Sequence, residues 1–210
     1  MSTLWRWTFG LGVAALLTVV PFVYFRCVYT HGKRLREVTP GRVYRSGQMT
    51  VEGFTDAVAR YHLRTIINLQ DEVPDPEIRQ SFLNGHTVPE SELCRRLGVR
   101  YVHLAPDLIS RRRCPADRPA AIGQFLAVMD DPATYPVLLH CRAGLHRTGV
   151  LTAVYRMEYD GWTPEEAVRE LKANGFGCFA CTAANDYITQ YILTYRCGVR
   201  VRPEAEGAGE

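Results

Sequence analysis

The stretch from Pro136 to Gly149, PVLLHCRAGLHRTG, sets narrow limits on how this chain of 210 residues can fold. Residues 136–141 are the most apolar of its strand-like runs, and strands buried on both faces of a parallel sheet have this composition. A helix-like stretch begins a few residues later, at Arg147. A buried strand that passes through a short loop into a helix is typical of α/β proteins. We therefore expect residues 136–141 to form a central strand.

The same alternation of strand-like and helix-like segments runs through the rest of the domain. Further strand-like runs are found at residues 42–46, 64–69 and 100–104. Helical spacing of apolar residues is found at residues 51–61, 90–98, 119–129, 147–161, 163–175 and 187–195. Together these patterns predict an α/β domain with a central, mostly parallel sheet flanked by helices.

The amino-terminal region has a different composition. Thr8 to Phe25 carry no charge, and 18 helical residues span about 27 Å, close to the hydrocarbon core of a bilayer. Trp5 and Trp7 flank one end and Tyr24 and Tyr29 the other, as aromatic residues at membrane interfaces do. We expect one transmembrane helix that anchors the chain in a membrane as a single-pass protein.

A cleaved signal peptide is the alternative interpretation of this region. No small-x-small cleavage site follows the apolar run, and the sequence YFRCVYTHGKRLR that does follow is bulky and basic. Only Arg6 precedes the span, whereas several basic residues follow it, which predicts that the large domain lies in the cytoplasm. The expected divisions are a membrane anchor with a basic juxtamembrane segment (1–37), a catalytic domain (38–200) and a disordered tail (201–210).

The net charge and the cysteines bear on possible partners, disulfides and metal sites. The net charge of +3 is mild, and we expect no nucleic-acid partner and a monomeric protein. Seven cysteines are scattered along the chain, without the pattern of a disulfide framework. Cys178 and Cys181 form a single CxxC pair without the second pair that a zinc site needs, so packing or surface positions are expected, with a redox role as the alternative.

Cys141 stands where the central strand gives way to a helix, so free backbone N–H groups and the positive end of a helix dipole lie near it. Gly144 can adopt backbone angles closed to other residues, which lets the turn direct its amides inward. Arg147 adds a planar fork that matches phosphate oxygens. These residues predict a cradle for a tetrahedral dianion, with the Cys141 sulfur below it as a thiolate placed for in-line attack on phosphorus.

The stretch from Cys141 to Thr148 has the C-x5-R-[ST] signature, with His140 before it and Gly149 after it. In this the chain resembles the cysteine-dependent protein tyrosine phosphatases. From about Gly41 to Cys197 it is similar to their compact dual-specificity branch, in particular to bacterial members and to atypical plant and fungal ones. The stretch RVYRSGQ, residues 42–48, is part of this resemblance.

The resemblance implies roles for the residues of the signature. Cys141 would be the nucleophile and form a phosphocysteine, Arg147 would hold phosphate oxygens, and Thr148 would hydrogen-bond the sulfur. His140 would support the loop. Backbone amides would bind the phosphate through the consecutive residues Arg142, Ala143, Gly144, Leu145, His146 and Arg147. The resemblance implies no metal and no cofactor, because the cradle itself neutralises the charge of the phosphate.

The resemblance also implies a general acid on a separate loop. Asp107 is our candidate, because it directly follows a strand-like run and Cys141 comes 34 residues later. Asp117 is the rival, but its place two residues before Pro119 favours a helix cap. Asp71 lies farther from Cys141 in the sequence and is interpreted as a loop residue.

Some features bear on the substrate. Arg111, Arg112 and Arg113 form a basic run that either faces solvent or binds polyanionic substrates or lipid headgroups. Members that act on highly phosphorylated inositols often carry a lysine inside the loop, where this chain has Leu145, although Arg142 could compensate in part.

The function expected from the sequence is that of a membrane-anchored phosphatase acting on phosphotyrosine or phosphoserine/threonine in proteins. The first alternative is hydrolysis of phosphoinositides or inositol phosphates. A catalytically dead, membrane-tethered phosphate-binding module and a sulfurtransferase are further alternatives. Turnover of p-nitrophenyl phosphate would separate the first two functions from the last two.

Overall fold

The computed structural model describes residues 3–104, 118–177 and 186–199. Its centre is a five-stranded sheet with the order β1-β2-β7-β3-β6, in which only the edge strand β1 is antiparallel to its neighbour. The strands of this sheet are β1 (Arg36–Thr39), β2 (Val43–Gly47), β3 (Thr65–Asn68), β6 (Arg100–His103) and β7 (Val137–Cys141). The prediction of a mostly parallel sheet with the run before Cys141 at its centre is confirmed.

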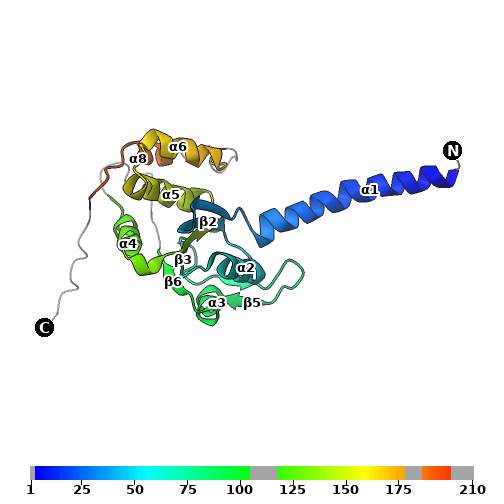
Figure 1. Ribbon diagram of the computed structural model, residues 1–210, viewed down its shortest axis with the longest axis horizontal. Coiled ribbons are helices and arrows are strands. Elements are labelled where there is room, and N and C mark those ends of the chain that lie inside the picture. The colour runs from blue at the N-terminus through cyan, green and yellow to red at the C-terminus, as the bar shows by residue number, and fades with distance from the viewer. Residues whose placement is uncertain (1–2, 105–117, 178–185, 200–210) are drawn as a thin grey trace.

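Helices cover both faces of the sheet (Figure 1). The helices of the described residues are α1 (Thr3–Phe25), the π-helical η1 (Arg26–His31), α2 (Val51–Tyr61), α3 (Glu90–Leu97), α4 (Ala120–Met129), the 3-10 turn η2 (Pro132–Thr134), α5 (His146–Tyr159), α6 (Pro164–Ala173) and α8 (Asp186–Leu193). Buried side chains of α4, α5, α6 and α8 form one hydrophobic cluster with one face of the sheet, and those of α2 and α3 form another with the opposite face. Successive residues of β7 alternate between them, since Leu139 belongs to the first cluster and Leu138 to the second.

Local sequence signals account for several helix ends. The side chain of Thr163 accepts a hydrogen bond from the backbone N–H of Glu166, whose carboxylate accepts one from the backbone N–H of Thr163, so a capping box begins α6. α3 ends at Gly98, which has a φ of 67°. The N-cap of α4 is Pro119, without a side-chain cap bond, and Asp117, which the sequence suggested as a cap, lies outside the described residues.

Three short strands were not predicted from the sequence. β4 (Glu77–Arg79) and β5 (Thr87–Pro89) form an antiparallel hairpin outside the main sheet. β1 begins at Arg36 and runs across residue 37, where the sequence suggested the end of the anchor segment. Each of these strands has three or four residues, too few to show a hydrophobic period.

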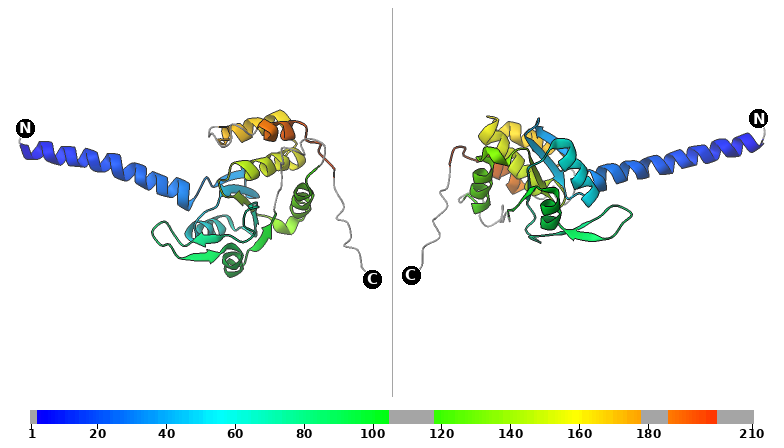
Figure 2. Two further views of the ribbon diagram at one scale, coloured as in Figure 1. Left: turned by 180° about the vertical axis from the view of Figure 1, so that it is seen from behind. Right: turned by 60° about the horizontal axis from the view of Figure 1, so that its bottom comes forward.

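The helix α1 extends away from the domain in all three ribbon views (Figures 1 and 2). Among the described residues, Trp5–His31 is the one helical stretch long and apolar enough to cross a membrane, with a mean hydropathy of 2.0. Near its carboxyl end, the rings of Phe22 and of Phe82 from the β4–β5 hairpin form a T-shaped pair, with 5.6 Å between ring centroids. A signal sequence has the same length and composition, so the membrane anchor stays a prediction.

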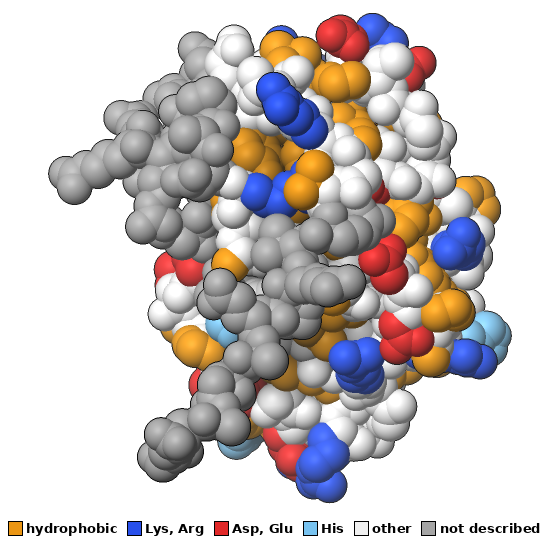
Figure 3. Space-filling model, turned by 90° about the vertical axis from the view of Figure 1, so that its left-hand side faces the viewer, with side chains coloured by type: hydrophobic (Ala, Val, Ile, Leu, Met, Phe, Trp, Pro, Cys, Tyr) orange, Lys and Arg blue, Asp and Glu red, His pale blue; other side chains and the backbone are white. Residues whose placement is uncertain are grey.

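The described surface carries charges of both signs. On the face at the left of Figure 1, basic and acidic side chains are interspersed with apolar ones (Figure 3). No single-sign region dominates the described side chains visible there.

Candidate active site

Cys141 is the last residue of β7, and its side chain is only 3% exposed. The strand lies between β2 and β3, so the carboxyl ends of three parallel strands surround the loop that follows. This loop leads directly into α5, which begins at His146. The strand–loop–helix arrangement predicted from the sequence is therefore present, and it exposes the first amides of α5 toward the end of β7.

Gly144 is essential to the shape of the loop. Its φ is 72°, in the left-handed region, and its N–H donates to the Cys141 Sγ at 3.3 Å. A Cβ at this position would lie 2.5 Å from the backbone nitrogen of Gly47 and 2.6 Å from the carbonyl of Ser46. Both the backbone angle and the close approach to β2 thus require glycine here.

Three consecutive carbonyl groups of the loop are bonded to the surrounding protein. The guanidinium of Arg34 donates to the Ala143 carbonyl at 2.9 Å, and that of Arg45 donates to the Gly144 carbonyl at 3.0 Å. The carbonyl of Arg142 accepts the N–H of Gln48 at 3.3 Å. In a trans peptide the N–H points opposite to the carbonyl, so these contacts fix the directions of the amides that follow, of which the Gly144 N–H points to the sulfur. The geometry suits a cradle for an anion.

The sulfur lies in positive surroundings. Three cations are close enough for the charge of Cys141 to favour their protonated forms, namely Lys33, Arg45 and Arg147. Arg45 is 4% exposed, and desolvation by burial lowers its pKa to about 10. The predicted positive environment of the nucleophile is therefore supplied by β2 and the juxtamembrane segment as well as by α5.

Arg147 lies in the first turn of α5 and is held by two acidic residues of the loop after β3. Its Nη1 and Nη2 donate to the two carboxylate oxygens of Glu72 at 2.9 and 3.0 Å, and Nη2 also pairs with Asp71. Burial opposes the charge of Arg147, but the hydrogen bonds of Glu72 and the charges of both carboxylates raise its pKa. The bond from Arg147 lowers the pKa of Glu72 to about 2, whereas desolvation raises that of Asp71. None of these contacts uses the Nε of Arg147.

His140 precedes the cysteine and is completely buried. Its Nε2 lies 2.5 Å from the Oε1 of Glu90, the first residue of α3, and that side chain is completely buried too. The ring of Phe54 packs edge-on against His140, with 5.2 Å between centroids. This position suits the supporting role expected for His140. Glu90 itself was not identified from the sequence, where it was interpreted as part of a helix start.

Thr148 occupies a buried position, but the hydrogen bond to the sulfur expected from the resemblance is not present. Its Oγ1 has no partner within the described parts of the chain, and the bond to Sγ comes from Gly144 instead. His146 packs its ring against Phe176, and desolvation followed by the charge of Arg147 lowers its pKa. Asp107, the predicted general acid, lies outside the described residues. The strand β6 that precedes it ends at His103, on the same edge of the sheet as Cys141.

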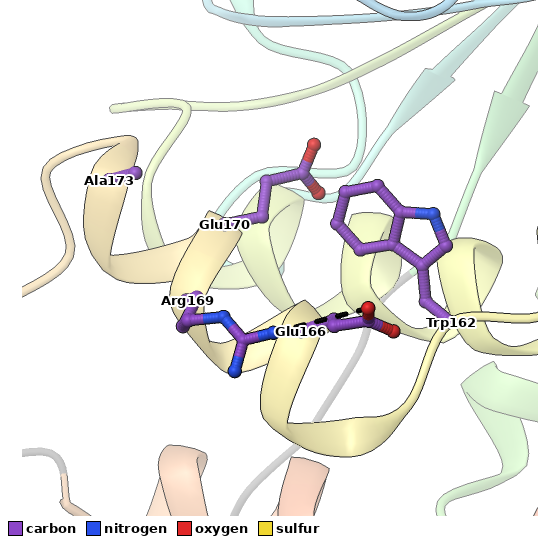
Figure 4. Close-up of a pocket in the computed structure, with 5 residues that line it drawn as sticks. All are labelled: Trp162, Glu166, Arg169, Glu170 and Ala173. Carbon is purple, nitrogen blue, oxygen red and sulfur yellow. Dashed lines mark ion pairs between the residues drawn. The ribbon is translucent and has the colours of Figure 1, made fainter.

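Two further observations concern other binding sites. A surface cleft of about 310 Å³ is lined by Trp162 and four residues of α6, namely Glu166, Arg169, Glu170 and Ala173 (Figure 4). It includes none of the residues of the Cys141 loop. Across residues 3–104, 118–177 and 186–199, no cluster of three or more His, Cys, Asp or Glu side chains could hold a metal ion.

The sheet order and the loop around Cys141 place the protein in the class of cysteine-dependent phosphatases of the dual-specificity type. Residues 18–186 match the family model described as "PTP-NADK: DSP-PTPase phosphatase fused to NAD+ Kinase", and the chain belongs to this family.

The chain is also similar to individual proteins, at low sequence identity. The tyrosine-protein phosphatase-like protein OCA2 of Saccharomyces cerevisiae is 27% identical over 159 residues, 76% of this chain and 71% of that protein. The inositol diphosphatase DSP1 of rice, Oryza sativa subsp. japonica, is 34% identical over 116 residues, 54% of this chain and 45% of that protein. The catalytic core of the PP-IP phosphatase SIW14 of S. cerevisiae has the same fold, with a TM-score of 0.57 at 21% identity, covering 78% of this chain and 86% of that one.

Proposed function

We propose that the protein hydrolyses phosphate monoesters through a phosphocysteine on Cys141. The observation that supports this most directly is the loop geometry, with the Gly144 N–H on the sulfur and three successive carbonyls bonded to the surrounding protein. The Cys141 thiolate would attack phosphorus as the P–O ester bond breaks, and the leaving oxygen would take a proton from the general acid. Water would then cleave the P–S bond, returning the thiolate and releasing inorganic phosphate.

The Cys141→Ser variant tests this mechanism. Turnover of p-nitrophenyl phosphate should fall to background, whereas binding of inorganic phosphate should persist because the amides and Arg147 remain. Cys197→Ser, at an exposed position, is the matched control and should keep full activity. Activity of Cys141→Ser clearly above background would exclude the phosphocysteine. A wild-type protein that binds phosphate without turnover would instead indicate a phosphate-binding module.

Phosphorylated proteins are the first substrate class that we propose, with phosphotyrosine or phosphoserine/threonine as the target. The name of the yeast relative, a tyrosine-protein phosphatase-like protein, supports this class. Inositol phosphates are the second candidate. They are favoured by the position of Lys33 beside the loop of Cys141, and the rice relative is named as an inositol diphosphatase.

We also propose that α1 anchors the protein in a membrane with the catalytic domain in the cytoplasm. The apolar span and the excess of basic residues after it support this topology. The residues that directly follow η1 contact the Cys141 loop, so the end of the span is joined closely to the catalytic domain. Carbonate extraction and protease protection on intact cells test the proposal. Release into the soluble fraction, or cleavage of the domain from outside, would contradict it.

A further inference from the structure

The segment between η1 and β1 lies directly on the loop of the catalytic cysteine. The Lys33 carbonyl accepts the N–H of Gly47 at 2.7 Å, and Gly47 is the register partner of Cys141 in the sheet. The next residue, Arg34, bonds the Ala143 carbonyl. A Cβ on Gly47 would lie 2.9 Å from the Cγ of Lys33 and 3.1 Å from the Ala143 backbone, so the lysine side chain runs alongside the loop.

The backbone of this segment adopts an uncommon conformation for its residue types. Lys33 and Arg34 have φ angles of 27° and 63°, in the region that favours glycine. Such angles persist only where surrounding contacts impose them, and they concentrate at binding sites. Here the contacts of both residues with β2 and the loop impose the conformation, and it directs their side chains toward the catalytic loop.

The charge of Lys33 has no acidic partner in the part of the chain that the structure describes. Its pKa is lowered by desolvation and by the neighbouring charges of Arg34 and Arg142, whereas the charge of Cys141 opposes this shift. Asp71 and Glu72, which contact the loop through Arg147, pair with that arginine instead. A half-buried ammonium that is repelled by two guanidinium groups is unfavourable unless an anion compensates it.

We propose that Lys33, together with the exposed Arg142, binds a second phosphate group of the substrate, next to the phosphate held above Cys141. This inference rests on the proposed phosphatase function and favours the second of its two candidate substrate classes, as small polyol phosphates with phosphates on neighbouring carbons. The position of Lys33 against Gly47 and Ala143 restricts it to groups very near the reacting phosphate. Neighbouring ring phosphates meet this requirement better than two phosphorylated residues of an extended peptide, whose side chains point to opposite sides.

The chain contains only two lysines, Lys33 and Lys172, and this permits a closely matched pair of variants. Lys172 is exposed in the last turn of α6 and serves as the control. We compare kcat/KM for an inositol bisphosphate with neighbouring phosphates and for an inositol monophosphate, using the full chain in detergent. Lys33→Gln should lower the ratio of the two values by about 10- to 100-fold, the loss of a hydrogen bond to a charged group. Lys33→Arg should restore part of it, and Lys172→Gln should leave it unchanged.

The source of the second phosphate is tested in further arms. One presents the same headgroup as phosphatidylinositol bisphosphate in vesicles and another presents a doubly phosphorylated peptide. If Lys33→Gln lowers the kcat/KM ratio only for the soluble bisphosphate or only for the lipid, the inference is supported and the source is identified. A drop only with the peptide overturns it, as does an unchanged ratio. Failure of the wild-type protein to hydrolyse p-nitrophenyl phosphate would instead refute the proposed function and leave the ratio undefined.

A binding measurement on the catalytically inactive Cys141→Ser variant provides a readout without turnover. Reductive methylation with ¹³C gives one dimethyl-lysine signal for each lysine besides that of the amino terminus. The inositol bisphosphate should shift the Lys33 signal and raise the pKa of its amine, because a second phosphate favours the charged form. Inorganic phosphate should shift it less, and the Lys172 signal should not move. Equal shifts with inorganic phosphate and with the bisphosphate would overturn the inference.

Discussion

Two sets of hydrogen-bonded, ionisable side chains flank Cys141, and they differ in their access to solvent. His140 and Glu90 are both completely buried, whereas Arg147 is 24% exposed and its partners Asp71 and Glu72 are 38% and 53% exposed. A buried pair cannot exchange partners, and removing one member leaves the other desolvated and unpaired. An accessible pair is weaker, and its cation can be shared with an arriving anion. The site therefore combines a permanent support below the loop with an adjustable arginine beside it.

This difference fits the parts that the two pairs play in the proposed reaction. The support must hold β7 and the start of the loop through both chemical steps, so its permanence is useful. Arg147 must keep the plane of its guanidinium while it receives and releases phosphate. Glu72 can hold that plane through Nη1 and Nη2 while Nε stays available to the ligand.

The largest effect on catalysis is expected from replacing the proton donor. The experiment also shows whether Asp71, which pairs with Arg147, supplies the acid. Asp107→Asn should lower kcat/KM by about 10²- to 10⁴-fold for alkyl phosphates and much less for activated aryl phosphates, because only a poor leaving group needs the proton. Asp71→Asn should lower kcat/KM by a similar, small factor for all leaving groups. The measurement is kcat/KM across a series of leaving groups. A steep dependence in Asp71→Asn, with a flat one in Asp107→Asn, would show that Asp71 is the acid.

A large effect on stability is expected from the buried pair. Glu90→Ala leaves His140 buried without its partner and should lower the free energy of unfolding by about 3–5 kcal/mol. Denaturant unfolding of the full chain in detergent measures this change. Glu92→Ala is the control on the same helix, because it removes surface contacts with Arg95 and Arg96 and should have a far smaller effect. Equal effects of the two variants would contradict the distinction between permanent and adjustable pairs.

The smallest effect is expected from the pH dependence of the accessible pair. The pKa of Glu72 falls from 4.5 to about 2 on folding, because Arg147 bonds its charged form. A lowered pKa means that Glu72 stabilises the fold above about pH 4.5 and that this contribution disappears as the pH falls toward 2. Glu72→Gln should therefore be less stable than the wild type above pH 4.5, by less than about 1 kcal/mol, and should match it near pH 2. The measurement is the free energy of unfolding of both proteins as a function of pH. A difference between them that stays constant from pH 2 to above pH 4.5 would contradict the lowered pKa of Glu72.

Much of the fold could be predicted from local patterns. The apolar run before Cys141, the helix at residues 51–61 and the capping box of α6 each depend on residues within one helix or one strand. The hairpin of β4 and β5 could not, because short strands form only when a partner segment pairs with them. The same holds for β1, whose pairing with β2 brings the juxtamembrane segment onto the sheet.

The sequence by itself determined the loop of Cys141, because an anion cradle is built from consecutive amides and needs only a glycine and an arginine at set positions. Its charged surroundings were decided by the tertiary structure alone. Lys33, Glu72 and Glu90 come from three distant segments, and no spacing in the sequence relates them to Cys141. They meet there because β7 inserts between β2 and β3, an order set by the burial of both faces of the sheet. Hydrophobic burial does not depend on which charged residues stand at the strand ends. The pairing of each cation with its carboxylate is therefore known only once the fold is assembled.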